Sequence, residues 1–183
     1  MQRVMILGQP GSGKSTLAQK LGARTGLPVF HIDHIHWSPG WVERPRDEKN
    51  RLCAEVHARA QWIFEGGHSA TWAERLARAD TVIWLDVPLG RRIWRVIRRS
   101  LFYWGRSRPD MPEGCPERFS LEFYRFIWRT RRSSRDQIRR LITQARAEKS
   151  VHVLHTLRDV DRFLDSLSAD RTGGTPSGGM QTG

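Results

Sequence analysis

A glycine-rich stretch at residues 8–16, Gly-Gln-Pro-Gly-Ser-Gly-Lys-Ser-Thr, constrains the fold of this chain more than any other feature. It fits the pattern G-x-x-x-x-G-K-[ST] and lies between an apolar run at 4–7 and a helical pattern at 14–25. Backbone N–H groups can surround a phosphate only where glycines let the chain curl, and the N-terminus of the following helix attracts negative charge. The sequence therefore predicts a strand, a phosphate-binding loop and a helix, in that order.

The residues of this loop have separate expected roles. Lys14 is predicted to reach the β- and γ-phosphates of a nucleotide and to act in catalysis, and Ser15 is predicted to offer its hydroxyl to Mg²⁺. ATP and Mg²⁺ are thus the expected cofactors. The residues predicted to bind the nucleotide are Gly8, Pro10, Gly11, Ser12, Gly13, Lys14, Ser15 and Thr16.

The rest of the chain alternates between strand and helix patterns. Strands are predicted at 29–33, 62–65, 81–86 and 151–154, with helices at 46–60, after residue 71, after residue 88, at 119–147 with a kink near 132–134, and up to residue 167. For the helix after residue 88 we expect Ile93, Ile97 and Leu101 to form the apolar stripe. Such alternation is typical of an α/β fold, with a mainly parallel sheet and helices on both faces.

Length and composition predict one domain. With 183 residues and 38% hydrophobic content, the chain can build a single core, which we place at residues 1–167. The apolar-poor segment 168–183 is expected to be disordered. The sequence contains neither an apolar run of membrane-spanning length nor a signal-peptide pattern, so a cytoplasmic location without membrane contact is expected. Cys53 and Cys115 are far apart in sequence and are expected to be idle thiols.

The positive charge of the chain is concentrated in one segment. The formal net charge is +12, and residues 91–146 hold sixteen arginines against five acidic residues. Such a segment suits a nucleic acid, a phosphate-rich small substrate or simply a solvated helix face, and composition alone does not separate these.

Two acidic residues are predicted to be the last residues of buried strands. Asp33 ends the strand 29–33 and Glu65 ends the strand 62–65, at the sheet edge where ligands of open α/β sheets bind. Glu65 is the candidate for the metal side of the site, and the alternative is a carboxylate that only caps the next segment. His31 and Asp33 are expected on one strand face, in a polar active-site edge rather than a dedicated metal site.

These motifs, in this order, resemble the P-loop kinases of the adenylate kinase and nucleoside monophosphate kinase superfamily. The chain is most similar to the bacterial topology modulation proteins within that group. The resemblance rests on residues 8–16, 30–37, 62–67 and 84–88, the arginine pair 98–99 and the loop 105–117. It implies a P-loop NTPase fold with a five-stranded sheet of order 2-3-1-4-5, an acceptor-binding segment at about 34–60 and a small lid at about 100–120.

The resemblance also implies roles for arginines. Arg95 would lie near the adenine and Arg99 near the phosphates, so that both bind the nucleotide. Arginines suit this task because their fixed positive charge stabilises the phosphoryl group in transfer. The catalytic arginines implied are Arg99, the lid residues Arg106 and Arg108, and Arg129 and Arg132 after the lid.

The sequence departs from the adenylate kinase pattern at the acceptor side. Where adenylate kinases carry D-G-x-P-R, residues 65–69 read Glu-Gly-Gly-His-Ser, which puts a nucleoside monophosphate acceptor in doubt. Residues 33–36 instead resemble the D-x-h-H of gluconate-type kinases, whose acceptor is a hydroxyl. A hydroxyl acceptor needs a carboxylate to take its proton, so Asp33 is either a catalytic base or a binding residue.

The predicted function is an ATP- and Mg²⁺-dependent phosphotransferase that acts on a nucleotide or a small hydroxyl compound. The alternatives are a nucleotide-gated DNA- or RNA-binding protein with little kinase activity, and an ATP-binding protein with negligible turnover. We expect a monomer or a weak dimer.

Overall fold

A five-stranded parallel sheet forms the centre of the protein. The computed structural model describes the backbone of residues 1–172 and the side chains of residues 1–167. The strands are β1 (Arg3–Gly8), β2 (Val29–His31), β5 (Trp62–Glu65), β6 (Thr81–Leu85) and β7 (Ser150–Leu154). Their spatial order is β2-β5-β1-β6-β7, which is 2-3-1-4-5 when only these five strands are counted along the chain. The predicted fold class and strand order are confirmed.

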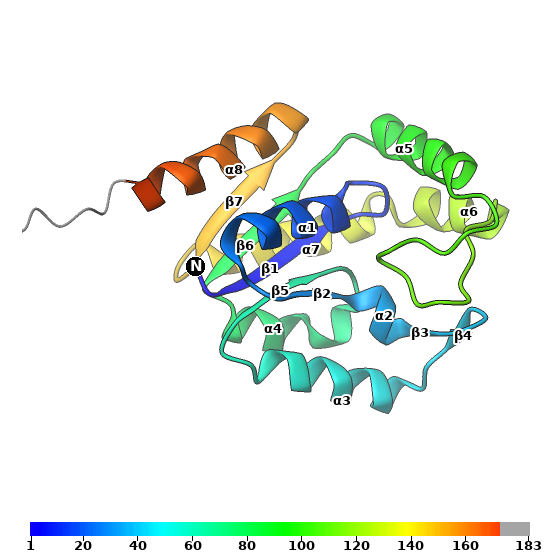
Figure 1. Cartoon of the computed structure of the whole chain (residues 1–183), viewed down its shortest axis with the longest axis horizontal. Coiled ribbons are helices and arrows are strands. Elements are labelled where there is room, and N and C mark those ends of the chain that lie inside the picture. The colour runs from blue at the N-terminus through cyan, green and yellow to red at the C-terminus, as the bar shows by residue number, and fades with distance from the viewer. Residues whose placement is uncertain (173–183) are drawn as a thin grey trace, which may run out of the picture.

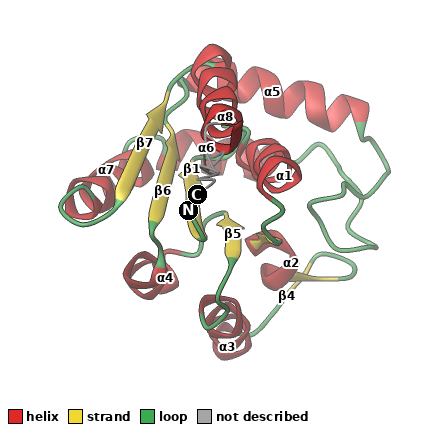
Figure 2. Ribbon diagram, turned by 60° about the vertical axis from the view of Figure 1, so that its left-hand side comes forward, coloured by secondary structure: helices red, strands yellow, loops and turns green. Residues whose placement is uncertain are grey.

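Helices cover both faces of the sheet (Figure 2). Successive side chains of β1 point to opposite faces, as the pleat of a strand requires. Val4 and Ile6 pack towards α1 (Lys14–Thr25) and α8 (Leu157–Thr172), whereas Met5 and Leu7 belong to the core on the other face. That second face is covered by α3 (Arg46–His57), α4 (Trp72–Arg78), preceded by the 3₁₀ turn η1 (Ser69–Thr71), and α7 (Ser133–Ala145).

The remaining elements gather at the carboxyl edge of the sheet (Figure 1). They are α2 (Ile32–His36), the hairpin of β3 (Trp37–Ser38) and β4 (Val42–Glu43), α5 (Leu89–Phe102) and α6 (Leu121–Thr130). Residues 103–120 join α5 to α6, and we call them the α5–α6 loop. Because β1 also ends at this edge, these elements surround the glycine-rich loop.

The second strand is shorter than predicted. It ends at His31, and α2 begins at Ile32, so the expectation that His31 and Asp33 share a strand face is wrong. Ile32 is buried against Gly66, where an added Cβ would come within 2.0 Å of the Ile32 side chain. This close packing turns the chain out of the sheet and places Asp33 in the first turn of a helix.

Three other boundaries also differ from the sequence expectation. The helix predicted at 119–147 is divided into α6 and α7 near the expected kink, and the region 37–45 contains the short β3–β4 hairpin. Helix α8 continues to Thr172, so residues 168–172 are helical rather than disordered. The expectation of disorder for 173–183 lies outside the described residues. Each helix within residues 1–172 is too short or too polar to cross a lipid bilayer.

The most buried face of α5 is shifted from the predicted one. Arg92, Val96 and Ser100 are buried, Ile93 and Ile97 of the predicted stripe are half-buried, and Leu101 is 69% exposed. The reason is that α5 lies on the glycine-rich loop, whose carbonyl oxygens accept hydrogen bonds from arginine side chains of this helix. Because α5 packs against polar backbone groups of the loop, the helix face that it buries is partly polar.

Candidate active site

The predicted phosphate loop is formed by the end of β1, residues 8–13 and the start of α1. Gly11 and Gly13 have φ angles of 77° and 97°, in the left-handed region that favours glycine. A Cβ at Gly11 would lie 2.5 Å from the carbonyl oxygen of Arg92 in α5. Only a glycine at position 11 therefore allows α5 to approach the loop this closely.

Glu65 contacts the hydroxyl of Ser15 at the end of the loop. Ser15 Oγ donates to Glu65 Oε1 over 3.0 Å, and His31 Nδ1 lies 2.7 Å from the same oxygen. The strand register explains this group, because His31 pairs with Glu65 between β2 and β5. Burial lowers the pKa of His31, but the hydrogen bond and charge of Glu65, with the charges of Asp110 and Asp33, outweigh burial and raise it.

The oxygens of Ser15 and Glu65 fit a magnesium ion. Mg²⁺ prefers oxygen ligands and is often held by one or two carboxylates together with substrate phosphates and water. Among the side chains of residues 1–167, no group of three or more His, Cys, Asp or Glu is arranged to hold a metal. Mg²⁺ at Ser15 would therefore depend on bound phosphates.

Asp33 lies beside the phosphate loop with a perturbed acidity. Burial raises the pKa of Asp33 to about 6, and the charge of Glu65 acts in the same direction, while Lys14 and Arg108 oppose the rise. A carboxyl group with this pKa is mostly ionised at neutral pH and is basic enough to accept a proton. Asp33 is the second residue of α2, so the backbone of this helix fixes its position.

A buried ionic network fixes the α5–α6 loop onto α5. Arg108 Nε lies 2.7 Å from Glu117 Oε2, and Arg108 Nη1 donates to Asp110 Oδ2 over 2.7 Å. The other oxygen of Glu117 accepts from Ser100 Oγ at 2.8 Å and from Arg99 Nη2 at 3.3 Å. Two predicted catalytic arginines, Arg99 and Arg108, are thus joined by one carboxylate that sequence reasoning did not single out.

Asp110 is a second residue that sequence reasoning missed. Burial raises the pKa of Asp110, but the charge of Arg108, a hydrogen bond with Ser15 and the charge of His31 outweigh burial and lower it. The loop therefore brings a further carboxylate to the hydroxyl that Glu65 contacts. The only signal in the sequence was its position in the predicted lid, because a single aspartate between two loop residues has no recognisable spacing.

A cavity of about 700 Å³ lies over the loop. It is bounded by residues 10–17 of the loop and α1, by α5, by the α5–α6 loop and by the start of α8. Arg95 and Arg99 both line it, and Arg95 Nη1 donates to the carbonyl oxygen of Ser12 over 2.8 Å. Its volume is in the range of small-ligand pockets, and its wall carries several positive charges.

The structure brings most of the predicted site residues together, but not all of them. Arg108 lines the cavity with Lys14, Ser15 and Thr16. Arg106 is exposed on the α5–α6 loop and Arg129 is exposed on α6, and neither lines this cavity. Arg132 lines a different cavity, between α5 and α7.

Comparison with known proteins identifies the fold. No protein-family model matches the chain. The chain is 29% identical over 138 residues to a cytidylate kinase of Pyrobaculum aerophilum, which covers 68% of this chain and 72% of that protein. The structure of the present chain is similar to that of shikimate kinase from Acinetobacter baumannii in complex with shikimate, with TM-score 0.54, 14% identity and 97% of both chains covered. Shikimate kinase from Bacteroides thetaiotaomicron gives TM-score 0.51 and 15% identity, with 93% of this chain and 98% of that chain covered. The fold is that of the P-loop kinases.

Proposed function

We propose that this protein is a P-loop phosphotransferase that moves the γ-phosphoryl group of ATP, with Mg²⁺, to a small-molecule acceptor. The observation that carries the proposal is the hydrogen bond from Ser15 to the buried Glu65, at the end of a loop that also presents Lys14 to a cavity of about 700 Å³. The similarity to a cytidylate kinase supports the same class of reaction.

The side chains of the cavity have complementary tasks in such a transfer. Lys14 and the loop amides bind the phosphates, and Arg99 and Arg108 stabilise the negative charge that spreads over the transferred group. Mg²⁺, when bound, neutralises charge on the β- and γ-phosphate oxygens. Glu117 holds the two arginines in position through the contacts described above, so that they need little reorganisation during the reaction.

Asp33 favours a hydroxyl group as the acceptor. A phosphate acceptor is already ionised, whereas a hydroxyl must lose a proton when it attacks phosphorus. Asp33 lies close enough to Lys14 and Glu65 for their charges to affect its pKa, and its pKa of about 6 suits a general base. We therefore infer that Asp33 takes the proton of the acceptor hydroxyl.

A nucleoside monophosphate is the second candidate acceptor, because the relative at 29% identity is a cytidylate kinase. In that case no proton has to be removed from the attacking oxygen, and Asp33 would be a binding residue. The two candidates differ in their dependence on Asp33, so they can be separated by experiment.

The decisive experiment measures ADP production with Mg·ATP against one panel of nucleoside monophosphates and one of nucleosides and small hydroxyl compounds. Lys14→Ala is the blank, and Lys149→Ala, next to β7 and outside the cavity, is the matched control. We expect stimulation by one class of acceptor, retained in the Lys149 variant and lost in the Lys14 variant. Turnover that survives the Lys14 substitution would refute the proposed site.

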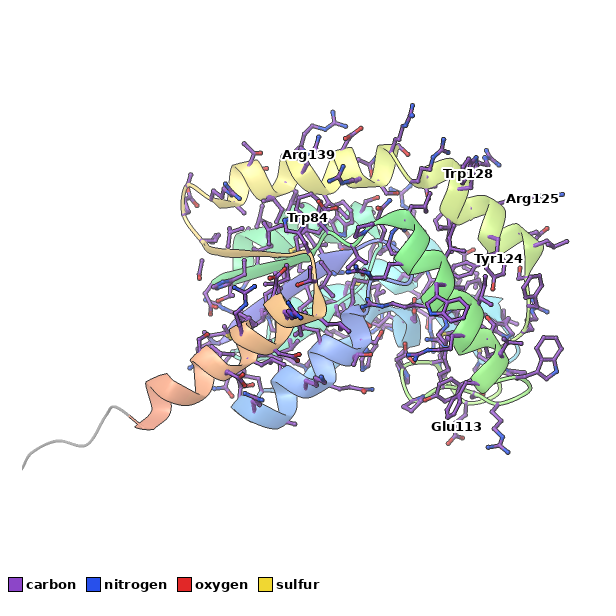
Figure 3. All side chains as sticks on the ribbon, turned by 90° about the horizontal axis from the view of Figure 1, so that it is seen from above. Trp84, Glu113, Tyr124, Arg125, Trp128 and Arg139 are labelled. Carbon is purple, nitrogen blue, oxygen red and sulfur yellow. The ribbon has the colours of Figure 1, made fainter. Side chains whose placement is uncertain are left out.

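The nucleic-acid alternative is supported by one surface feature. Large aromatic side chains on α5, α6 and the α5–α6 loop are exposed beside arginines, as with Trp128 (56% exposed) and Arg125 on α6 (Figure 3). Exposed aromatic rings can stack on bases while arginines contact phosphates. If neither acceptor panel stimulates turnover while ATP still binds, DNA binding that weakens steeply with salt becomes the expected result.

A further inference from the structure

The cavity of about 700 Å³ over the glycine-rich loop is called the nucleotide cavity below. A second cavity, of about 650 Å³, lies on the other side of α5. It is formed where the start of α5, the first half of α7 and the segments after β6 and β7 meet. Figure 3 shows the neighbouring helices α5 and α7, with Arg139 labelled on α7. The arginines that line the cavity are Arg91, Arg92, Arg131, Arg132, Arg135 and Arg139.

The cavity carries an excess of positive charge. Its six arginines face two aspartates, Asp86 and Asp136, so four formal positive charges are uncompensated. Arg135 uses both oxygens of Asp86, with Nε to Oδ1 and Nη2 to Oδ2 at 2.8 Å each, and Arg139 lies 3.6 Å from Asp136. In the described part of the chain, the other four lining arginines form no ion pair. The uncompensated charge therefore lies on the cavity wall.

Arg92 shows that this charge is partly buried. Its side chain is 2% exposed, its Nη1 donates to the carbonyl oxygen of Pro10 over 3.3 Å, and its buried Nε has no hydrogen-bond partner. Burial lowers the pKa of Arg92, the charge of Asp86 opposes this, and Arg135 adds to it. A buried guanidinium with an unpaired N–H is unfavourable unless an anion or a hydrogen-bond acceptor satisfies it.

The lining also has an apolar part. Val87, Pro88 and Leu89 line the cavity beside the arginines, and its volume is in the range of small-molecule pockets. Arginine side chains bind phosphate with paired, charge-assisted hydrogen bonds, and an apolar wall suits the organic part of the same molecule. We propose that this cavity binds a phosphorylated small molecule, at a site separate from the nucleotide cavity.

The site is also connected to the phosphate loop. Gln9, which is buried and lines this cavity, donates from Nε2 to the carbonyl oxygen of Arg131 over 2.9 Å and to that of Thr130 over 3.4 Å. The two cavities meet at Val87 and Thr156. A ligand between α5 and α7 would therefore contact the wall that positions the loop, which is why the test has to separate two sites from one extended site.

The test is calorimetric titration of the full chain with inorganic pyrophosphate as the probe. The wild type is expected to bind two equivalents, and Lys14→Ala, which weakens the phosphate loop, is expected to keep one. In the Lys14→Ala background, the pair Arg91→Gln and Arg139→Gln should weaken the remaining site by at least about tenfold, since each removes a charge-assisted hydrogen bond.

The matched control is the pair Arg140→Gln and Arg146→Gln in the same background. Both side chains are exposed: Arg140 follows Arg139 on α7, and Arg146 comes directly after the last residue of the helix. Neither lines the cavity, and the change in net charge is the same. Retained affinity in this control supports a specific site. Equal weakening in both pairs would show that only the general positive charge matters and would overturn the proposal.

Two further outcomes would also overturn it. A single equivalent of pyrophosphate in the wild type, or complete displacement of both equivalents by one ATP, would mean that the cavities form one nucleotide site. A short single-stranded DNA that competes with pyrophosphate in the Lys14→Ala protein, and loses affinity with Arg91→Gln and Arg139→Gln, would assign the arginines to a nucleic-acid surface. Circular dichroism of each variant confirms that it is folded.

Discussion

Replacing Asp33 by asparagine should make the protein more stable and far less active at the same time. The rise of the Asp33 pKa from its ordinary value of 3.8 to about 6 means that the folded state disfavours the ionised carboxylate. At about 1.36 kcal/mol for each pH unit, this corresponds to about 3 kcal/mol; because the residue is only half-buried, solvent screening reduces it to about 1–2 kcal/mol. An asparagine side chain at this position would carry no charge and would avoid this cost.

The sign of the effect depends on pH in a defined way. Below about pH 4 Asp33 is protonated in both the folded and the unfolded state, so the variant and the wild type should be similar in stability. Between about pH 4 and pH 6 only the unfolded state releases the proton, and the wild type loses stability relative to the variant. Above about pH 6 the difference should be constant. Urea unfolding at pH 4, 5, 6 and 7.5 without nucleotide measures it.

The kinetic part of the prediction uses the same substitution. If Asp33 accepts the proton of a hydroxyl acceptor, Asp33→Asn should lower kcat by about 10²–10⁴-fold. The wild-type kcat/KM should fall below about pH 6, and this acid limb should be absent from the residual activity of the variant. Unchanged turnover would leave Asp33 a binding residue and favour a phosphate acceptor.

Asp110→Asn is the control with the opposite sign. The charge of Arg108 and the hydrogen bond with Ser15 keep the pKa of Asp110 low despite burial, so its ionised form stabilises the folded state above its ordinary pKa. This contribution is lost as the pH falls through the lowered pKa, so the substitution should destabilise the protein at neutral pH. The reasoning about charge in this site is refuted if Asp33→Asn destabilises the protein at pH 7.5.

Three further predictions concern the same site. Glu65→Gln removes the charge that raises the pKa of His31, so the His31 pKa measured by NMR titration should fall, and an unchanged value would contradict the described contact. Glu117→Gln weakens the buried link between the α5–α6 loop and α5; we expect a loss of about 3 kcal/mol or more in unfolding free energy and a higher KM for ATP, and no change in either would exclude the positioning role. Gly11→Ala places a Cβ 2.5 Å from a carbonyl oxygen of α5, so ATP affinity measured by calorimetry should drop at least about tenfold, whereas Gly26→Ala, which meets no atom within 4 Å, controls for backbone strain alone.

Local pattern was sufficient for the sheet and for the phosphate loop. The strands around β1 read directly as apolar runs because they are covered on both faces, and the strand order implied by the family resemblance is the order observed. Lys14, Ser15 and Glu65 could be singled out because a loop motif has fixed spacing and because Glu65 ends a strand at the carboxyl edge of the sheet; the structure places Ser15 and Glu65 in contact. Arg95, Arg99 and Arg108 were proposed from the resemblance, and all three line the cavity.

Contacts between segments distant in sequence determined the end of β2, the buried face of α5 and the charged neighbours of the site, and the spacing of residues in one sequence does not predict such contacts. The packing of Ile32 on Gly66 ended β2 early and placed Asp33 on a helix. The carbonyl oxygens of the phosphate loop selected the arginine face of α5 for burial, against its apolar stripe. Asp110 and Glu117 lie at the site because of the path that the α5–α6 loop takes. Arg132 lies at the break between α6 and α7 and lines the second cavity instead. The sequence by itself determined which backbone could bind phosphate, because that depends on local geometry; tertiary structure determined which charges meet around it, because electrostatic pairing depends on distance in space.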